Sequence, residues 1–189
     1  ELITEANFKT AVNLWFTDEA NATVTYGHIS DWNVSEVVDM SDSFKSRSTF
    51  NEDISNWDVS KVNSMRDMFH GATAFNQPIG KWDISSVTGM GHMLRSATSF
   101  NYDIGDWNTS KVTDMRFVLR NVVSFNQDIS RWDTSNVTRM DGFFMENNSL
   151  SSINKGLIHQ TFSTNSNWPY AWRSFVPDHT ADLNASVQL

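Results

Sequence analysis

The residues best suited to chemistry form a column of Asp and Asn side chains that recurs at a constant spacing. Each member follows a Trp by one position: Asn33, Asp58, Asp83, Asn108 and Asp133. Carboxylate and amide oxygens are the ligands that calcium prefers, and carboxylates stacked about 4.8 Å apart would repel one another without a cation. The alternative is that these side chains hydrogen-bond to loop backbone or face solvent beside cations such as Lys81 and Arg131.

We favour the second interpretation and predict no metal and no cofactor. A second acidic column, Asp53, Asp103 and Asp128, is interrupted by His28 and Pro78, so it does not form a regular ion ladder. The nonapeptide pattern of calcium-binding β-rolls is absent. The five histidines share no metal-ligand spacing, whereas zinc needs three or four convergent ligands.

A column of serines lies two residues beyond the Asp/Asn column: Ser35, Ser60, Ser85, Ser110 and Ser135. A flat hydroxyl array could bind ice, but charged residues adjoin this one, and capping of helices explains it without a ligand. The chain has no Cys, which removes thiolate nucleophiles and Cys-based metal sites. No nucleophile elbow, phosphate loop or acid–base pair stands out. We therefore predict that the protein is not an enzyme.

Composition narrows the classes of partner further. The 189 residues carry a formal net charge of −8, whereas nucleic-acid binders cluster Lys and Arg, so we expect no nucleic acid. No apolar run approaches the roughly 18 residues that a transmembrane helix needs, so we expect no membrane insertion.

A sequence repeat predicts the structural elements that must position these side chains. Five units of equal length, about 25 residues each, succeed one another without an insertion. Each begins with a phrase such as FNEDISNWDVSKVNSMRDMF (50–69). The columns predicted to form the structural core are those of Trp and Met: Trp32, Trp57, Trp82, Trp107, Trp132, Met40, Met65, Met90, Met115 and Met140. We expect the Trp rings to stack as a spine.

Within one unit the spacing between apolar residues changes. Trp57 and Val59 alternate with polar residues, which is typical of a short strand with one buried face. Val62, Met65 and Phe69 then follow at spacings of three and four, which is typical of a helix, with Ser60 as its N-cap. A single unit cannot bury its apolar side alone, so neighbouring units must stack.

The segments outside the repeat are predicted to cap the array within one domain. Residues 1–26 hold a capping helix and a lead-in, with Thr4 as the N-cap and Phe8, Val12 and Trp15 on the apolar face. Residues 27–150 are the five units, 151–177 an aromatic C-terminal cap, and 178–189 a tail. The fold class is thus an α/β repeat, a right-handed leucine-rich-repeat-like solenoid of strand–helix units with a helical N-cap and an aromatic C-cap.

The phrases YGHISDWNVSEVVDM and FNQDISRWDTSNVTRM resemble the BspA-like leucine-rich-repeat group, a bacterial surface-protein repeat of about 25 residues. The resemblance spans residues 26–144, and Phe-Asn, Trp-Asp and Val-x-x-Met recur in fixed register. It implies a non-catalytic module, extracellular or at the cell surface, that is associated with adhesion.

The function we predict is a binding or adhesion module whose strand face meets a protein or glycan ligand. The outward candidates on that face are Asp31, Asn33, Asn56, Asp58, Lys81, Asp83, Asp106, Asn108, Arg131 and Asp133. The alternative is a structural subunit of a larger assembly, by self-association or with other chains. Exposure of Val122, Val123 and the aromatic C-terminal segment would favour that alternative.

Overall fold

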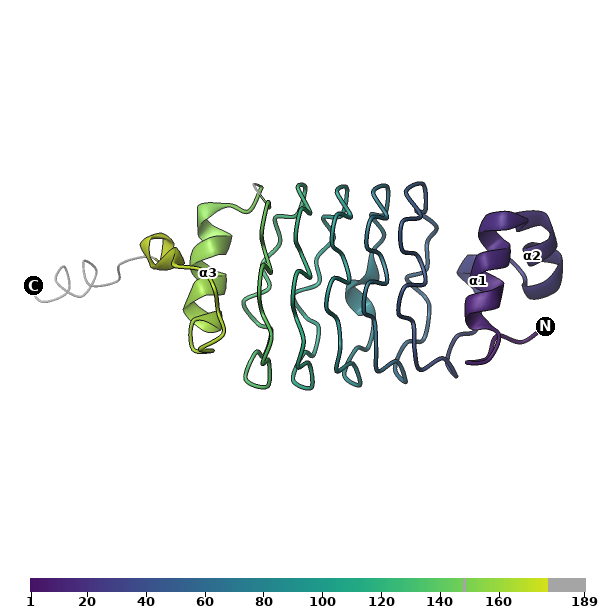
Figure 1. Ribbon diagram of the computed structural model, residues 1–189, viewed down its shortest axis with the longest axis horizontal. Coiled ribbons are helices and arrows are strands. Elements are labelled where there is room, and N and C mark those ends of the chain that lie inside the picture. The colour runs from purple at the N-terminus through teal and green to yellow at the C-terminus, as the bar shows by residue number, and fades with distance from the viewer. Residues whose placement is uncertain (148, 177–189) are drawn as a thin grey trace, which may run out of the picture.

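A row of stacked coils lies between helical ends (Figure 1). The computed structural model describes residues 1–147 and 149–176, so the predicted tail at 178–189 lies outside the described residues. Helices α1 (Phe8–Thr17) and α2 (Glu19–Tyr26) lie at one end, and α3 (Ser152–Phe162) lies at the other. Three short 3₁₀ turns complete the elements: η1 (Ile29–Asp31), η2 (Ile79–Lys81) and η3 (Trp172–Phe175).

The predicted strand and helix of each unit are absent from the described part of the repeat, so the α/β leucine-rich-repeat-like fold class is wrong. The only β pairing there is a series of isolated parallel bridges that joins Asp39, Ser64, Gly89, Asp114 and Arg139. Residues 66–71, where the helix was expected, are consecutive turns. Each unit is therefore an irregular coil that stacks on the next.

The destinations of the backbone N–H groups explain why no helix forms. In residues 65–71 every second N–H donates to a carbonyl of the next coil, and these are the N–H groups of Met65, Asp67, Phe69 and Gly71. Between them, the N–H groups of Met68 and His70 close turns within the coil, to the carbonyls of Met65 and Asp67. A helix needs those same N–H groups for carbonyls four residues back. Stacking of the coils therefore competes with helix formation for the same N–H groups, and these groups bond to the next coil instead of forming a helix.

This alternation requires left-handed residues at two positions of each coil. The first lies two residues after the Met: Asp42, Asp67, His92, Phe117 and Gly142. The second lies six residues after it: Ser46, Gly71, Ser96, Asn121 and Glu146. All ten have φ between +55° and +74°, a region that costs a residue with a Cβ about 1–2 kcal/mol. The bonds to the next coil offset this local cost.

The predicted core columns lie inside the stack. All five Trp and all five Met side chains are buried. Each indole from Trp57 to Trp132 donates its Nε1–H to the carbonyl of an Ile in the preceding coil, 28 residues earlier, at 2.9–3.2 Å. The same carbonyl also accepts the backbone N–H of the Trp in its own coil. Through the two hydrogen bonds to this shared Ile carbonyl, the I-x-x-W motif holds neighbouring coils together.

Phenylalanine forms the long aromatic stack. Phe50, Phe75, Phe100 and Phe125 stack face to face, with ring centres 5.9–6.2 Å apart and nearly parallel planes. The Trp rings of the repeat stack on one another only between coils 1 and 2 (Trp32–Trp57) and between coils 4 and 5 (Trp107–Trp132). The predicted Trp spine is thus discontinuous.

The Asn after each Phe forms a ladder along the surface. The side-chain oxygens of Asn51, Asn76 and Asn101 each accept the backbone N–H of the Asn in the following coil, at 2.8–3.0 Å. Asn126 extends the ladder to Ser151, the N-cap of α3. Because the ladder reaches α3, it joins the terminal helix to the repeat.

The two ends cover the open faces of the first and last coils. Helix α1 buries Phe8, Ala11, Val12 and Trp15, but its N-cap is Asn7 rather than the predicted Thr4. At the other end, Trp168, Tyr170 and Trp172 pack against the core, and the Tyr170 hydroxyl accepts the backbone N–H of Phe144.

Candidate binding surfaces

The ten predicted contact residues divide into two columns on either side of the buried Trp, and all ten are exposed. We call the residues after the Trp the post-Trp column: Asn33, Asp58, Asp83, Asn108 and Asp133. Each side chain accepts the backbone N–H of the Ser two residues later, at 2.8–3.2 Å. These side chains therefore form Asx turns, a structural role in which each one satisfies its own backbone.

The electrostatics of this column follow from those turns. Hydrogen bonds from the side chain and then the backbone of the adjoining Ser lower the pKa of Asp58, Asp83 and Asp133 below its ordinary value. The serines are not helix N-caps, since no helix follows them. Reversing a charge in this column would disturb a turn as well as a surface, so the column is a poor place to test binding.

The residues before the Trp, which we call the pre-Trp column, have no such structural role. They are Asp31, Asn56, Lys81, Asp106 and Arg131. Among the described residues, the only ion pair within this column joins Arg131 Nη2 to Asp106 Oδ1 at 3.0 Å, and both side chains are well exposed. Because an exposed pair contributes about 0–1 kcal/mol, these positions can vary without disturbing the coil.

A shallow hollow of about 240 Å³ opens beside the pre-Trp column. Its lining residues are Pro78, Gly80, Lys81, Tyr102, Asp103 and Asp106. Two of them, Lys81 and Asp106, belong to the column, and the Tyr102 side chain beside them is 41% exposed. The sequence analysis missed Tyr102, although an aromatic residue after the Phe-Asn phrase departs from Glu52, Gln77 and Gln127 at the same position.

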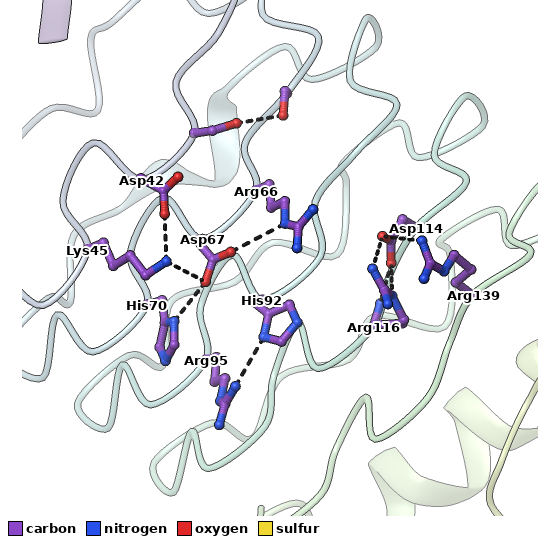
Figure 2. Close-up of polar contacts among 12 residues, drawn as sticks. Asp42, Lys45, Arg66, Asp67, His70, His92, Arg95, Asp114, Arg116 and Arg139 are labelled. Carbon is purple, nitrogen blue, oxygen red and sulfur yellow. Dashed lines mark hydrogen bonds and ion pairs between the residues drawn. The ribbon is translucent and has the colours of Figure 1, made fainter.

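A cluster of charged side chains lies on the turns that follow the Met residues (Figure 2). The Asp67 carboxylate faces three nitrogen groups: the His70 imidazole Nδ1 at 2.7 Å, and the cationic Arg66 Nε at 3.4 Å and Lys45 Nζ at 3.5 Å. Burial alone would raise the pKa of Asp67, but the hydrogen bond from His70 and the charges of Lys45 and His92 outweigh it, and the pKa is lowered. Asp67 is thus an ionised carboxylate in a cradle of basic side chains.

A second carboxylate, which is half-buried, lies two coils further along and is also visible in Figure 2. Asp114 accepts two hydrogen bonds from the Arg116 guanidinium, at 2.8 and 2.9 Å, and lies 3.8 Å from Arg139. Burial opposes ionisation, but the hydrogen bonds and charges of these arginines lower the pKa of Asp114. Neither cluster was predicted from the sequence, because each is completed by a side chain from a neighbouring coil, Lys45 at Asp67 and Arg139 at Asp114.

We expect Asp114→Asn to destabilise the protein by about 1–2 kcal/mol at pH 7, since it removes a charged acceptor of hydrogen bonds. The folded-state pKa lies below the unfolded value, so this stabilisation is full above about pH 4 and is lost as pH falls through the folded pKa. Urea unfolding at pH 7 and pH 3 should show the variant and the wild type converging at the lower pH. Asp106→Asn, at an exposed pair, is the control, and its effect should be near zero at both values. An Asp114→Asn deficit that persists unchanged at pH 3 would contradict the assignment.

Within residues 1–147 and 149–176, no group of three or more His, Asp or Glu side chains is placed to hold a metal ion. No helix in that part of the chain has both the length and the apolar character to cross a membrane. Val122 is buried and Val123 is 39% exposed, so only one residue of the apolar turn reaches the surface.

The stack of coils and its surfaces define a repeat protein that builds its core from side chains recurring once in every coil. The chain matches the family described as "Mycoplasma protein of unknown function, DUF285" over residues 8–109 and again over 101–167, and it belongs to that family. No curated protein and no solved structure matches it.

The family match and the fold correct two predictions. The resemblance to BspA-like leucine-rich repeats is wrong, because the matching family is a different one and the described coils lack the strand of a leucine-rich repeat. The prediction of a protein or glycan partner, or of self-association, is also set aside, because it depended on a strand face that the described residues do not form. The comparisons assign no partner in its place.

Proposed function

We propose that this protein is a non-catalytic binding module that acts outside the cell or at its surface. The observation that carries the proposal is the hollow beside the pre-Trp column, which Tyr102 lines together with Asp106 of its own coil and Lys81 of the preceding coil. Tyr is enriched at binding hot spots because it buries a large area at a low cost in conformational entropy.

The stacked coils support the proposal because they hold this surface in advance of binding. The backbone below the hollow is fastened by the Trp107 indole, which donates to the carbonyl of Ile79, and by the Asn76–Asn101 rung of the ladder. A surface that is already ordered pays less conformational entropy when a ligand binds. The pre-Trp column offers alternating charges along the stack, since Lys81, Asp106 and Arg131 lie in successive coils.

The test measures adhesion of beads that carry the full chain to monolayers of cultured epithelial cells. We expect Tyr102→Ser to lower the number of bound beads at least about fivefold, as a hot-spot residue would. Val123→Ser is the matched control, because Val123 is exposed to a similar extent (39%) and lies in a different turn, and it should bind as the wild type does.

A second pair of variants tests the charges. Asp106→Arg with Arg131→Asp reverses both charges while it keeps an ion pair and the net charge, and we expect weaker adhesion. Glu36→Lys with Lys61→Glu does the same to an exposed pair outside the column and should have no effect. Wild-type beads that do not adhere above uncoated beads would refute the module, whereas adhesion that ignores Tyr102 and the column would refute the surface.

A further inference from the structure

The cradle around Asp67 recurs two coils further on, but without its carboxylate. The three basic side chains at Asp67 are Lys45, Arg66 and His70. The equivalent positions two units later are Arg95, Arg116 and Arg120, so every basic position of the cradle is now an arginine. The same shift takes Asp67 to Phe117. The repeat has thus kept and strengthened the basic positions and has removed the acid.

The three arginines have made other contacts. Arg116 is held by Asp114, and Arg120 Nη2 lies 3.1 Å from Glu146 Oε1. Arg95 donates only to the Nδ1 atom of His92, at 3.3 Å, and none of the ion pairs formed by the described residues includes it. Arg95 is half-buried, and no carboxylate of the described residues pairs with it, so its guanidinium is open to an anion from outside the chain.

Phe117 gathers two of these guanidinium groups. The Arg95 and Arg120 guanidinium carbons lie 5.9 and 5.6 Å from the centre of its ring. The ring is half-buried, and the His92 ring lies against it with a centre-to-centre distance of 4.9 Å. The positive edge of an aromatic ring is compatible with a neighbouring anion.

The backbone at Phe117 is left-handed, with φ of +56°, which is rare for a bulky residue. Asp42, Asp67 and His92 have the same conformation at this position of their coils, so Phe117 occupies the place of an Asp without a change of backbone. In the next coil the position is Gly142, where a Cβ would come within 2.3 Å of the Phe117 ring. The absence of a side chain at Gly142 therefore leaves room for the Phe117 ring, and the Arg95 and Arg120 guanidinium groups lie beside that ring.

We propose that Arg95 and Arg120, which meet at the Phe117 ring, form a binding site for a carboxylate that a ligand supplies in place of the side chain found at Asp67. Arginine suits this role because its planar guanidinium accepts a carboxylate in bidentate geometry. The site lies on the turns after the Met residues, away from the hollow at Tyr102, so the proposal goes beyond the function proposed above and does not depend on it. Two sources can supply the group: a small carboxylic acid, or a Glu or Asp side chain of an acidic peptide.

Isothermal titration calorimetry on the full chain tests the proposal with two probes. One is citrate, and the other is a capped Gly-Glu-Gly-Glu-Gly peptide, compared with the same peptide carrying Gln in place of Glu. We expect the wild type to bind citrate, the Glu peptide or both, and the Gln peptide at least about tenfold more weakly than the Glu peptide if the latter binds. Which probe binds more tightly identifies the source.

The decisive variants differ by one charge at one position. Phe117→Asp restores the internal carboxylate, so it should weaken binding at least about tenfold, as should Arg95→Gln. Phe117→Asn has the same shape as the Asp variant but no charge, and it should keep the affinity within about twofold of the wild type. Thermal unfolding controls for folding, since Phe117→Asp should melt no lower than Phe117→Asn if the cradle is completed. Equal binding by the Asp and Asn variants, or a wild type that binds neither citrate nor the Glu peptide, would overturn the proposal.

Discussion

Replacement of Trp107 by Ala should lower the free energy of unfolding by about 3–5 kcal/mol, one of the two largest effects we expect in this protein. The indole is 3% exposed, so Ala leaves a cavity at the boundary between two coils. It also removes the donor to the carbonyl of Ile79, at 3.2 Å, and the stack on Trp132, whose ring centre is 5.9 Å away.

Trp107→Phe separates the hydrogen bond from the packing. Phe keeps an aromatic ring but has no N–H, and the Ile79 carbonyl retains its second partner, the backbone N–H of Trp82. We therefore expect a smaller cost, about 1–2 kcal/mol, since the carbonyl is not left unpaired. Urea unfolding followed by far-UV circular dichroism measures both variants.

Trp15→Phe is the control for the Trp107 series. Trp15 is also buried, but it lies in α1, outside the series of indole-to-carbonyl hydrogen bonds that join the coils. Its cost should be smaller than that of Trp107→Phe. If Trp107→Phe were as stable as the wild type, the indole bond would contribute nothing, and volume alone would explain the recurrence of Trp.

Replacement of Phe100 by Ala should cost a similar amount, about 3–5 kcal/mol. Phe100 is fully buried and is stacked between two neighbours, with ring centres 6.0 Å from Phe75 and 6.2 Å from Phe125. The loss falls in the middle of the array, where each coil contacts only its two neighbours. The interfaces on both sides of coil 4 are therefore weakened together.

A double-mutant cycle tests the stack itself, with Leu in place of Phe so that the chain remains folded. Phe75→Leu and Phe100→Leu remove a shared contact, so their effects should differ from additivity by about 0.5–1.5 kcal/mol. Phe50→Leu and Phe100→Leu are two coils apart and should be additive within about 0.5 kcal/mol. Urea unfolding of the single and double variants gives both couplings. Equal coupling for the two pairs would show that the rings are not linked through direct contact.

The register of the fold could be predicted from the sequence because a stacked array repeats the same environment once in every coil. A side chain that faces the core in one coil has its equivalents facing the core in all the others, so the columns of Trp57 and Met65 mark the interior. The helix α1 was also visible as an apolar stripe, since it forms its hydrogen bonds within one continuous segment.

The conformation of each coil could not be predicted in this way. Val62, Met65 and Phe69 are spaced as on a helix, yet the same spacing arises when turns alternate with bonds to the next coil. The two arrangements bury the same side chains and differ only in where the backbone N–H groups donate. For Met65 that acceptor is the carbonyl of Gly89, which is remote in sequence.

For the exposed residues, too, some features could be predicted from the sequence and others depend on the tertiary structure. The sequence by itself determined which residues recur beside each Trp, and so identified Lys81 and Asp106 as outward candidates. The structure distinguishes them from Asp58 and Asp83, whose carboxylates accept the backbone N–H of the Ser two residues later, because the hydrogen bonds of an Asx turn are seen only in the folded geometry. Only stacking brought the Asp67 cradle together from adjacent coils, and so revealed that Phe117 stands where a carboxylate would be expected. The reason is physical: a repeat specifies its period locally, but its hydrogen bonds and charges are satisfied between coils.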